Sequence, residues 1–129
     1  MILDVLVPVL VALAGGLGAA ARLVVDGMVR TRWPRTFPVA TLVVNVTGSA
    51  VLGLLLGGHL AGVVPTPVLL VAGVGFCGGY TTFSTAMVET VRLAQDGDAA
   101  RAVGNVLASF ALCLAVAAAA TALAAAAWG

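Results

Sequence analysis

Four long apolar stretches alternate with three short polar connections along the chain, and this pattern sets the expected architecture. Each stretch reaches the length of about 20 residues that a helix needs to cross the hydrocarbon core of a bilayer. Prolines gather in the first two connections, where helices are expected to end. The pattern predicts an all-α membrane protein with a single domain over residues 1–129. Its transmembrane helices are expected at roughly 2–25, 38–58, 67–91 and 99–128.

The third apolar stretch is interrupted by a run of glycines and hydroxyl side chains. The run consists of Gly73, Gly75, Gly78, Gly79, Thr81, Thr82, Ser84 and Thr85. Hydrocarbon offers no hydrogen-bond partner to an opened backbone or a spare hydroxyl, so such a run is not expected on a lipid-facing helix. Irregular backbone at membrane depth occurs where it is buried in protein or lines a cavity, often as an ion site. We therefore predict a break near the middle of the third helix, at about residues 75–82.

Composition agrees with a membrane protein and narrows the possible functions. The chain is 62% hydrophobic and 9% charged, and its mean hydropathy is +1.18. These values lie well outside the range of soluble domains. The few basic residues exclude nucleic-acid binding. Cys77 and Cys113 lack a metal-ligand spacing and are expected to be small buried hydrophobic residues.

All six basic residues are arginines, and they gather on one predicted side of the membrane. They are Arg22, Arg30, Arg32, Arg35, Arg92 and Arg101. With four spans, the first and third connections share a side, whereas the second connection and both termini carry no arginine. Positively charged flanks stay cytoplasmic. We therefore expect a multi-pass protein of the cell membrane whose N- and C-termini both lie outside.

Small and polar residues recur every four positions along the second and fourth stretches, which places them on one face of each helix. They are Thr41, Asn45, Ser49, Gly53 and Gly57 on the second stretch, and Asn105, Ser109 and Cys113 on the fourth. Such residues pack helices closely and bond across them. Amide and hydroxyl donors can equally line a pathway for an anion. The residues alone support the two interpretations about evenly.

Charged residues near the predicted break are few. Arg22 either reaches the membrane interface or places positive charge at a vestibule. Glu89 lies about two turns past the break and is expected to pair with Arg92, three residues later on the same helix face. A proton-coupled exporter needs an ionisable group within the membrane. The sequence contains no deeply placed carboxylate for that role.

Three motifs, in order along the chain, are similar to those of one known family. They are GGLGAAAR at 15–22, PVATLVVNVTGS at 38–49, and GVGFCGGYTTFST at 73–85, the last followed by Glu89. Together with the four-span layout, they resemble the Fluc (CrcB-like) family of fluoride ion channels over nearly the whole chain. The resemblance implies a passive channel, not an enzyme, that exports cytoplasmic fluoride and so reduces its toxicity.

The same resemblance implies a dimer of two antiparallel four-helix subunits, with fluoride pathways at their interface. Backbone carbonyls at the break, those of Gly78 and Thr81, would bind a structural sodium ion. The ring of Phe83 would face the permeating ion, whereas Ala86 stands where the family places a second phenylalanine. If the chain pairs with a different subunit, one of the two pathways is therefore expected to be degenerate. The implied polar track consists of Asn45, Thr82, Ser84, Thr85, Asn105 and Ser109.

The arginine bias also bears on the second subunit. A homodimer with subunits in both orientations requires nearly balanced flanking charges, and the six arginines all favour one orientation. We therefore hypothesise a heterodimer, in which the partner is a related four-span subunit of opposite orientation. A second copy of this chain is the alternative partner.

Three other functions compete with the channel. A small multidrug-type proton-coupled exporter also has four spans and forms dimers, but the missing deep carboxylate speaks against it. A non-transporting protein that organises membrane assemblies or lipids would leave the hydroxyl-rich break unexplained. An intramembrane enzyme lacks support because the spans hold no Ser/His pair, paired carboxylates or metal-ligand constellation.

Overall fold

A computed structural model describes residues 1–33 and 37–129, and every regular element among them is helical. The first, second and fourth long helices are α1 (Ile2–Arg32), α2 (Val39–Leu60) and α6 (Ala99–Trp128). The third span is assembled from four shorter pieces. These are α3 (Thr66–Val68), the π-helical segment η1 (Leu69–Cys77), α4 (Gly78–Tyr80) and α5 (Ser84–Gln95).

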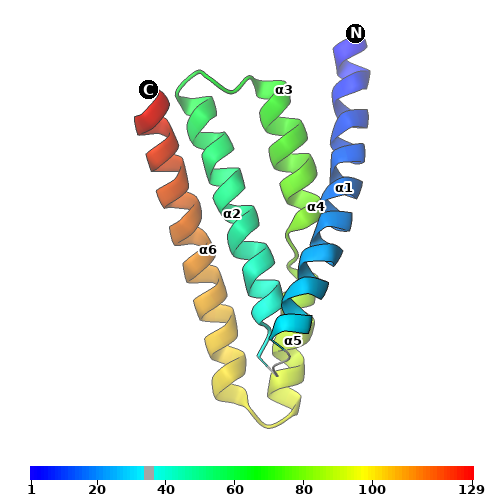
Figure 1. The fold of residues 1–129 in the computed structure, drawn as a ribbon, viewed down its shortest axis with the longest axis vertical. Helices are drawn as coiled ribbons and strands as arrows, with labels where there is room; N and C mark the ends of the chain where they lie inside the picture. The colour runs from blue at the N-terminus through cyan, green and yellow to red at the C-terminus, as the bar shows by residue number, and fades with distance from the viewer. Residues whose placement is uncertain (34–36) are drawn as a thin grey trace.

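The helices run up and down in a bundle, with the third span bent (Figure 1). Both termini and the connection between α2 and α3 lie at one end, and the turn between α5 and α6 lies at the other. Four helical segments of the described chain are long and apolar enough to cross a membrane. The predicted all-helical architecture with four apolar spans and a bent third helix is therefore confirmed.

Glycines bring the backbones of α1 and the third span into contact. A Cβ added at Gly18 would overlap the carbonyl oxygen of Phe76, and one added at Gly79 would overlap the backbone of Gly15. At Gly75 it would lie 2.8 Å from the carbonyl oxygen of Val11. Small residues allow this close approach, which drives helix association where lipid removes the hydrophobic gain. Gly75 and Gly79 of the third span are therefore packing residues.

The small and polar residues on one face of α2 serve two purposes: some pack against α6 and others form hydrogen bonds to the third span. Gly53 and Gly57 face α6, where an added Cβ at Gly53 would lie 2.5 Å from the carbonyl oxygen of Ala117. At these two positions the packing interpretation is confirmed. Thr41 and Asn45, nearer the start of the helix, instead bond to residues of the third span.

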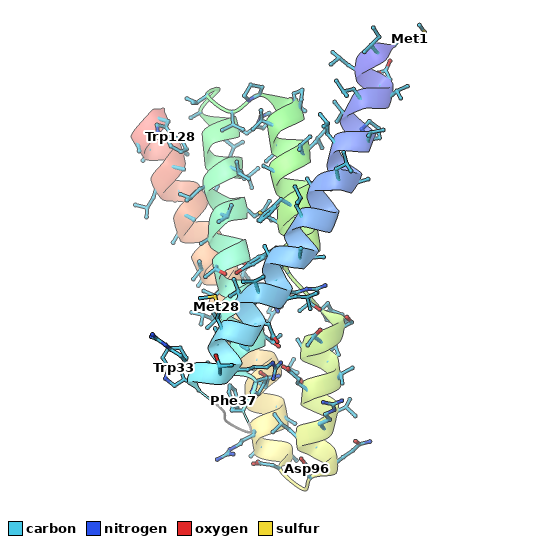
Figure 2. All side chains as sticks on the ribbon, turned by 45° about the vertical axis from the view of Figure 1, so that its right-hand side comes forward. Met1, Met28, Trp33, Phe37, Asp96 and Trp128 are labelled. Atoms are coloured by element: carbon cyan, nitrogen blue, oxygen red, sulfur yellow. The ribbon has the colours of Figure 1, made fainter. Side chains whose placement is uncertain are left out.

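The first helix is longer than the span expected at 2–25. It continues to Arg32, so Asp26 and Arg30 lie on the helix and not in a connection. An ion pair between Asp26 Oδ2 and Arg30 Nε, 2.7 Å long and four residues apart, supports this extension. At 31 residues, α1 measures about 46 Å, more than the core thickness of about 30 Å. It crosses the bundle obliquely from Met1 to Trp33 (Figure 2).

The other predicted bounds differ less from the observed helices. The second helix covers 39–60 where 38–58 was expected, and the third span covers 66–95 where 67–91 was expected. The fourth covers 99–128 as expected. Gly97, with φ of +83°, forms the turn after α5. Arg35, one of the arginines in the first connection, lies outside the described residues.

Candidate functional site

The third span opens at Thr81, Thr82 and Phe83, between α4 and α5. Thr81 has an extended backbone, with φ of −77° and ψ of 159°. The opening falls at the end of the range predicted at 75–82, because the glycines at 75, 78 and 79 stay within η1 and α4. The predicted range therefore begins too early in the chain. Thr81, Thr82 and Phe83 form the opened segment, whereas Gly75 and Gly79 set the contact with α1.

Asn45 on α2 holds the opened backbone in place. Its Nδ2 donates to the carbonyl oxygen of Thr82 at 2.9 Å, and its Oδ1 accepts from the Thr82 N–H at 2.8 Å. Both backbone groups of Thr82 are thereby satisfied without water, as the apolar surroundings require. One Asn45 N–H has an acceptor among the described residues, which leaves the second N–H of the amide for a ligand.

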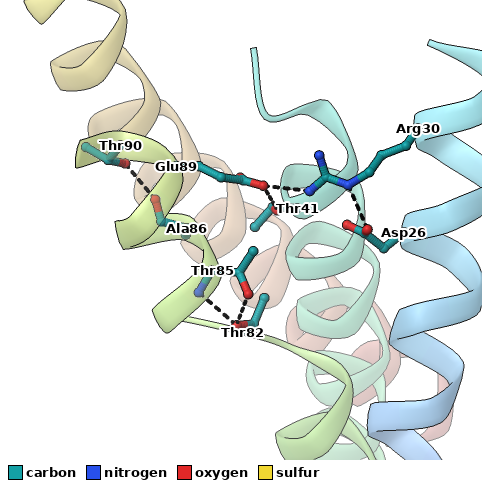
Figure 3. Close-up of polar contacts among 8 residues, drawn as sticks. All are labelled: Asp26, Arg30, Thr41, Thr82, Thr85, Ala86, Glu89 and Thr90. Atoms are coloured by element: carbon teal, nitrogen blue, oxygen red, sulfur yellow. Dashed lines mark hydrogen bonds and ion pairs between the residues drawn. The ribbon is translucent and has the colours of Figure 1, made fainter. Parts of the chain in front are cut away.

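The Thr82 side chain begins the next helix. Its Oγ1 accepts from the Thr85 N–H at 3.2 Å and donates to Thr85 Oγ1 at 3.1 Å (Figure 3). Ser84 Oγ lies 3.4 Å from Thr82 Oγ1. From one residue before the N-cap position, Phe83, the Thr82 hydroxyl satisfies an N–H of the first turn of α5 as a capping side chain does. The three hydroxyls predicted as one track are thus joined, and Thr82 is buried with 8% of its surface exposed.

The carbonyl groups predicted to bind sodium lie beside this opening. In a continuous helix the Thr82 N–H would bond to the carbonyl of Gly78, and here it turns to Asn45 instead. An added Cβ at Gly78 meets nothing within 4 Å, so space is present at this position. Arg22 Nη1 lies 3.5 Å from the Thr81 carbonyl oxygen, which draws this arginine toward the opening. Such hard oxygen donors suit a hard cation.

The predicted pathway residues line two cavities. The first, about 540 Å³ in volume, lies between α2, the third span and α6. It is lined by Asn45, Ser49, Gly78, Thr81, Thr82, Phe83, Asn105 and Ser109, among others. The second, about 480 Å³, is lined instead by Ser84 and Thr85 together with Arg30, Glu89 and Arg92. The bonds between Thr82 and Thr85 connect the two linings.

Glu89 belongs to an ion-pair network between three helices, and the expected pair with Arg92 is wrong. Glu89 Oε1 accepts from Arg30 Nη2 at 2.6 Å and from Thr41 Oγ1 at 3.0 Å, and Arg30 also binds Asp26 (Figure 3). The cause is the extension of α1, which brings Arg30 to α5. Glu89 Oε2 is buried and has no hydrogen-bond partner among the described residues. Arg92 and Glu89 line the same cavity.

Asn105 forms a bond between α5 and α6. Its Nδ2 donates to Thr90 Oγ1 at 2.8 Å, and Thr90 donates to the carbonyl oxygen of Ala86 at 2.7 Å. Ser109 Oγ donates to Asn105 Oδ1 at 3.4 Å. Asn105 is 2% exposed, so its amide is engaged in packing although it borders the first cavity. Thr90 was missed from the sequence because it lies outside the recognised motif.

Arg30 was also missed as a residue near the site, although the sequence contained a signal. Its spacing of four residues from Asp26 indicates a helical pair, and that spacing extends the first helix beyond the apolar stretch. Among residues 1–33 and 37–129, no group of three His, Cys, Asp or Glu side chains could hold a metal ion.

Comparison with known proteins identifies the family. Residues 9–121 match the family described as "CrcB-like protein, Camphor Resistance (CrcB)". A relative from Leifsonia xyli, named fluoride-specific ion channel FluC 1, is 57% identical over 90 residues, covering 70% of this chain and 66% of the relative. This chain thus spans slightly less than two thirds of that relative.

Two further relatives carry similar names. One from Mycobacterium tuberculosis strain H37Rv, named fluoride-specific ion channel FluC 2, is 49% identical over 107 residues, covering 83% of this chain and 82% of the relative. One from Syntrophotalea carbinolica, named fluoride-specific ion channel FluC, is 44% identical over 100 residues, covering 77% of this chain and 81% of the relative. The family match covers most of the sequence and includes the opened third span. The chain therefore belongs to the CrcB-like protein family.

Proposed function

We propose that this chain is one subunit of a passive, fluoride-selective channel in the cell membrane. Fluoride would leave the cytoplasm through it, down its electrochemical gradient, which reduces the toxicity of the ion. Membership of the CrcB-like family and the names of the relatives support this function. The single structural observation that carries it is the opened third span, held by Asn45 and bordered by uncharged donors.

The chemistry of the lining suits a small anion that has shed its water. Hydroxyl and amide groups donate hydrogen bonds without adding a fixed charge, so they replace hydration without trapping the ion. Asn45 and Phe83 both line the first cavity, so the second N–H of Asn45 and the edge of the Phe83 ring would be the groups that meet the ion. Ring edges carry partial positive charge. Ser84 and Thr85 would continue the pathway in the second cavity.

We propose further that the carbonyl groups of Gly78 and Thr81 bind a structural sodium ion. The diverted Thr82 N–H and the space at Gly78 support this assignment. A bound cation would fix the opened backbone and add positive potential beside the pathway. Arg22, which donates to the Thr81 carbonyl oxygen, would add further positive charge near the opening.

The proposed assembly is an antiparallel dimer with a homologous four-span subunit. The arginines of the described helices lie toward the end of the bundle that contains the α5–α6 turn (Figure 1). That end would face the cytoplasm, with both termini outside. A fixed orientation favours a heterodimer over a pair of identical chains. Ala86 would make one of the two pathways degenerate.

The competing transport function finds less support. A proton-coupled exporter needs an ionisable group accessible within the membrane. Glu89 is already bonded to Arg30 and Thr41 near the end of the bundle. No observation on the described residues favours a multidrug-type exporter or a non-transporting assembly protein over the channel.

The direct test is fluoride efflux from liposomes that contain the purified full chain, measured alone and then with a four-span homologue from the same organism. Efflux only with the homologue would support the heterodimer. Full efflux from the chain alone would refute the heterodimer and retain the channel. No efflux under either condition would refute the proposed function.

A further inference from the structure

One face of α6 is turned toward the first cavity, and it includes a phenylalanine that the sequence motifs do not single out. The α6 residues that line the cavity are Asn105, Val106, Ser109, Phe110 and Cys113. Their spacing of three, four and seven positions defines one side of a helix. Leu107 and Leu114 are 64% and 60% exposed and are not among these lining residues of the described chain. Phe110 therefore belongs to the cavity face of α6.

The rings of Phe83 and Phe110 border the same space from two different helices. Phe83 is 78% exposed and Phe110 is 72% exposed, so neither ring is buried against other residues of the subunit. Phe76, by contrast, is stacked on Tyr80, with ring centroids 6.0 Å apart. The cavity is thus lined by two exposed aromatic rings, Phe83 from the third span and Phe110 from α6.

Position 86 belongs to the part of α5 that is bonded to α6. Ala86 borders the same cavity with a small side chain and is 8% exposed. Its carbonyl is bonded to Thr90, which in turn holds Asn105 on α6. This chain of bonds fixes the part of α6 that carries Phe110 against α5. Phe110 follows Asn105 by five residues, so its position relative to Ala86 is set by the same contact.

We infer that Phe110 is a second aromatic residue that faces the permeating anion and contributes to its selection. This inference rests on the proposed fluoride conduction. The cavity offers few polar donors, and an anion within it must be stabilised largely by neutral groups. A ring edge carries partial positive charge and interacts with an anion without binding it as a fixed charge would. Aromatic character at position 110 is therefore required, beyond apolar volume.

The test compares non-aromatic and aromatic replacements in the liposome efflux assay, using the full chain in whichever pairing conducts fluoride. Phe110→Leu is expected to lower fluoride efflux between about twofold and tenfold. It should also lower the ratio of fluoride to chloride permeability. Phe110→Tyr keeps the ring and is expected to retain most of both values. Leu107→Ala, which changes the other face of α6, is the matched control and should conduct as the wild type does.

The ratio of fluoride to chloride permeability distinguishes a change in selectivity from a loss of folded protein, because the ratio does not depend on how many channels enter the liposomes. Phe110→Met supplies a second non-aromatic variant with a flexible side chain of similar length. The inference would be overturned if Phe110→Leu and Phe110→Met both conduct fluoride as fast as the wild type does and keep its ratio of fluoride to chloride permeability. An equal loss in Leu107→Ala would also overturn it. If Phe83→Ile abolishes efflux while Phe110→Leu does not, the channel function stands and the role of Phe110 is refuted. Absence of wild-type fluoride efflux would refute the proposed function itself.

Discussion

The amide of Asn45 uses one donor and its acceptor on the backbone of Thr82, so its first task is structural. The sequence placed Asn45 on a polar face but could not decide between packing and ion contact. The observed geometry shows the packing role, since the amide bridges two helices, and Asn45 also lines the first cavity, where contact with the ion is proposed. Such a double role cannot be read from spacing, because it depends on where the third span opens.

Replacing Asn45 separates these two roles. Asn45→Ala leaves the N–H and carbonyl of Thr82 without their partner, and we expect the free energy of unfolding to fall by about 1–2 kcal/mol. Thermal unfolding of the purified protein in detergent measures this loss. Ser49→Ala, on the same face and cavity, is the control and should change stability by less.

Asn45→Asp tests the uncharged character of the lining. Aspartate can still accept from the Thr82 N–H, but it loses the donated bond and adds negative charge beside the pathway. We expect fluoride efflux to fall at least about tenfold, which corresponds to about 1.4 kcal/mol. Efflux equal to that of the wild type in this variant would remove Asn45 from the pathway.

At the scale of the helices, hydropathy was sufficient to predict four spans, because a bilayer requires about 20 apolar residues per helix. It missed the last turns of α1, where Asp26 and Arg30 form a pair along a helix that continues past the apolar stretch. It also placed the start of the break at Gly75, which is helical in the structure. Composition indicated an irregular segment, but the contacts of Gly75 and Gly79 with α1 that explain these glycines are tertiary features.

The start of α5 depends on the Thr82 hydroxyl. Thr82→Val keeps the shape of the side chain and removes the cap, so the first turn of α5 should be less stable by about 1 kcal/mol. Hydrogen exchange at the Thr85 amide is expected to accelerate by about fivefold as a result. Thr82→Ser retains the hydroxyl and should leave exchange nearly unchanged. Equal exchange in the valine variant would show that the cap contributes little.

The contact between α1 and α5 is tested by a double-mutant cycle on Arg30 and Glu89. The Arg30 side chain is 49% exposed and the Glu89 side chain 12% exposed. We therefore expect a coupling free energy of about 0.5–1 kcal/mol between Arg30→Gln and Glu89→Gln, with partial loss at high salt. Arg92→Gln replaces Arg30→Gln in the control cycle. Coupling of Glu89 to Arg92 and not to Arg30 would contradict the observed pairing.

At the scale of the whole molecule, the charge distribution makes the proposed orientation testable. Reporter fusions to the C-terminus should place it outside the cell, because the arginine-bearing ends of the helices stay cytoplasmic. Introducing two arginines, at Val63 in the connection between α2 and α3 and at Thr66, the first residue of α3, should produce a mixture of both orientations. A cytoplasmic C-terminus in the unmodified chain would contradict the proposed topology and weaken the case for a heterodimer.

The central claim is that the opened third span, lined by neutral donors, conducts fluoride. Fluoride efflux from liposomes is the most direct measurement, recorded with wild-type chain and with Asn45→Asp, each alone and with the homologous subunit. We predict rapid, chloride-excluding efflux in at least one wild-type preparation and its loss in the matching variant. The absence of fluoride efflux from every wild-type preparation would contradict the account.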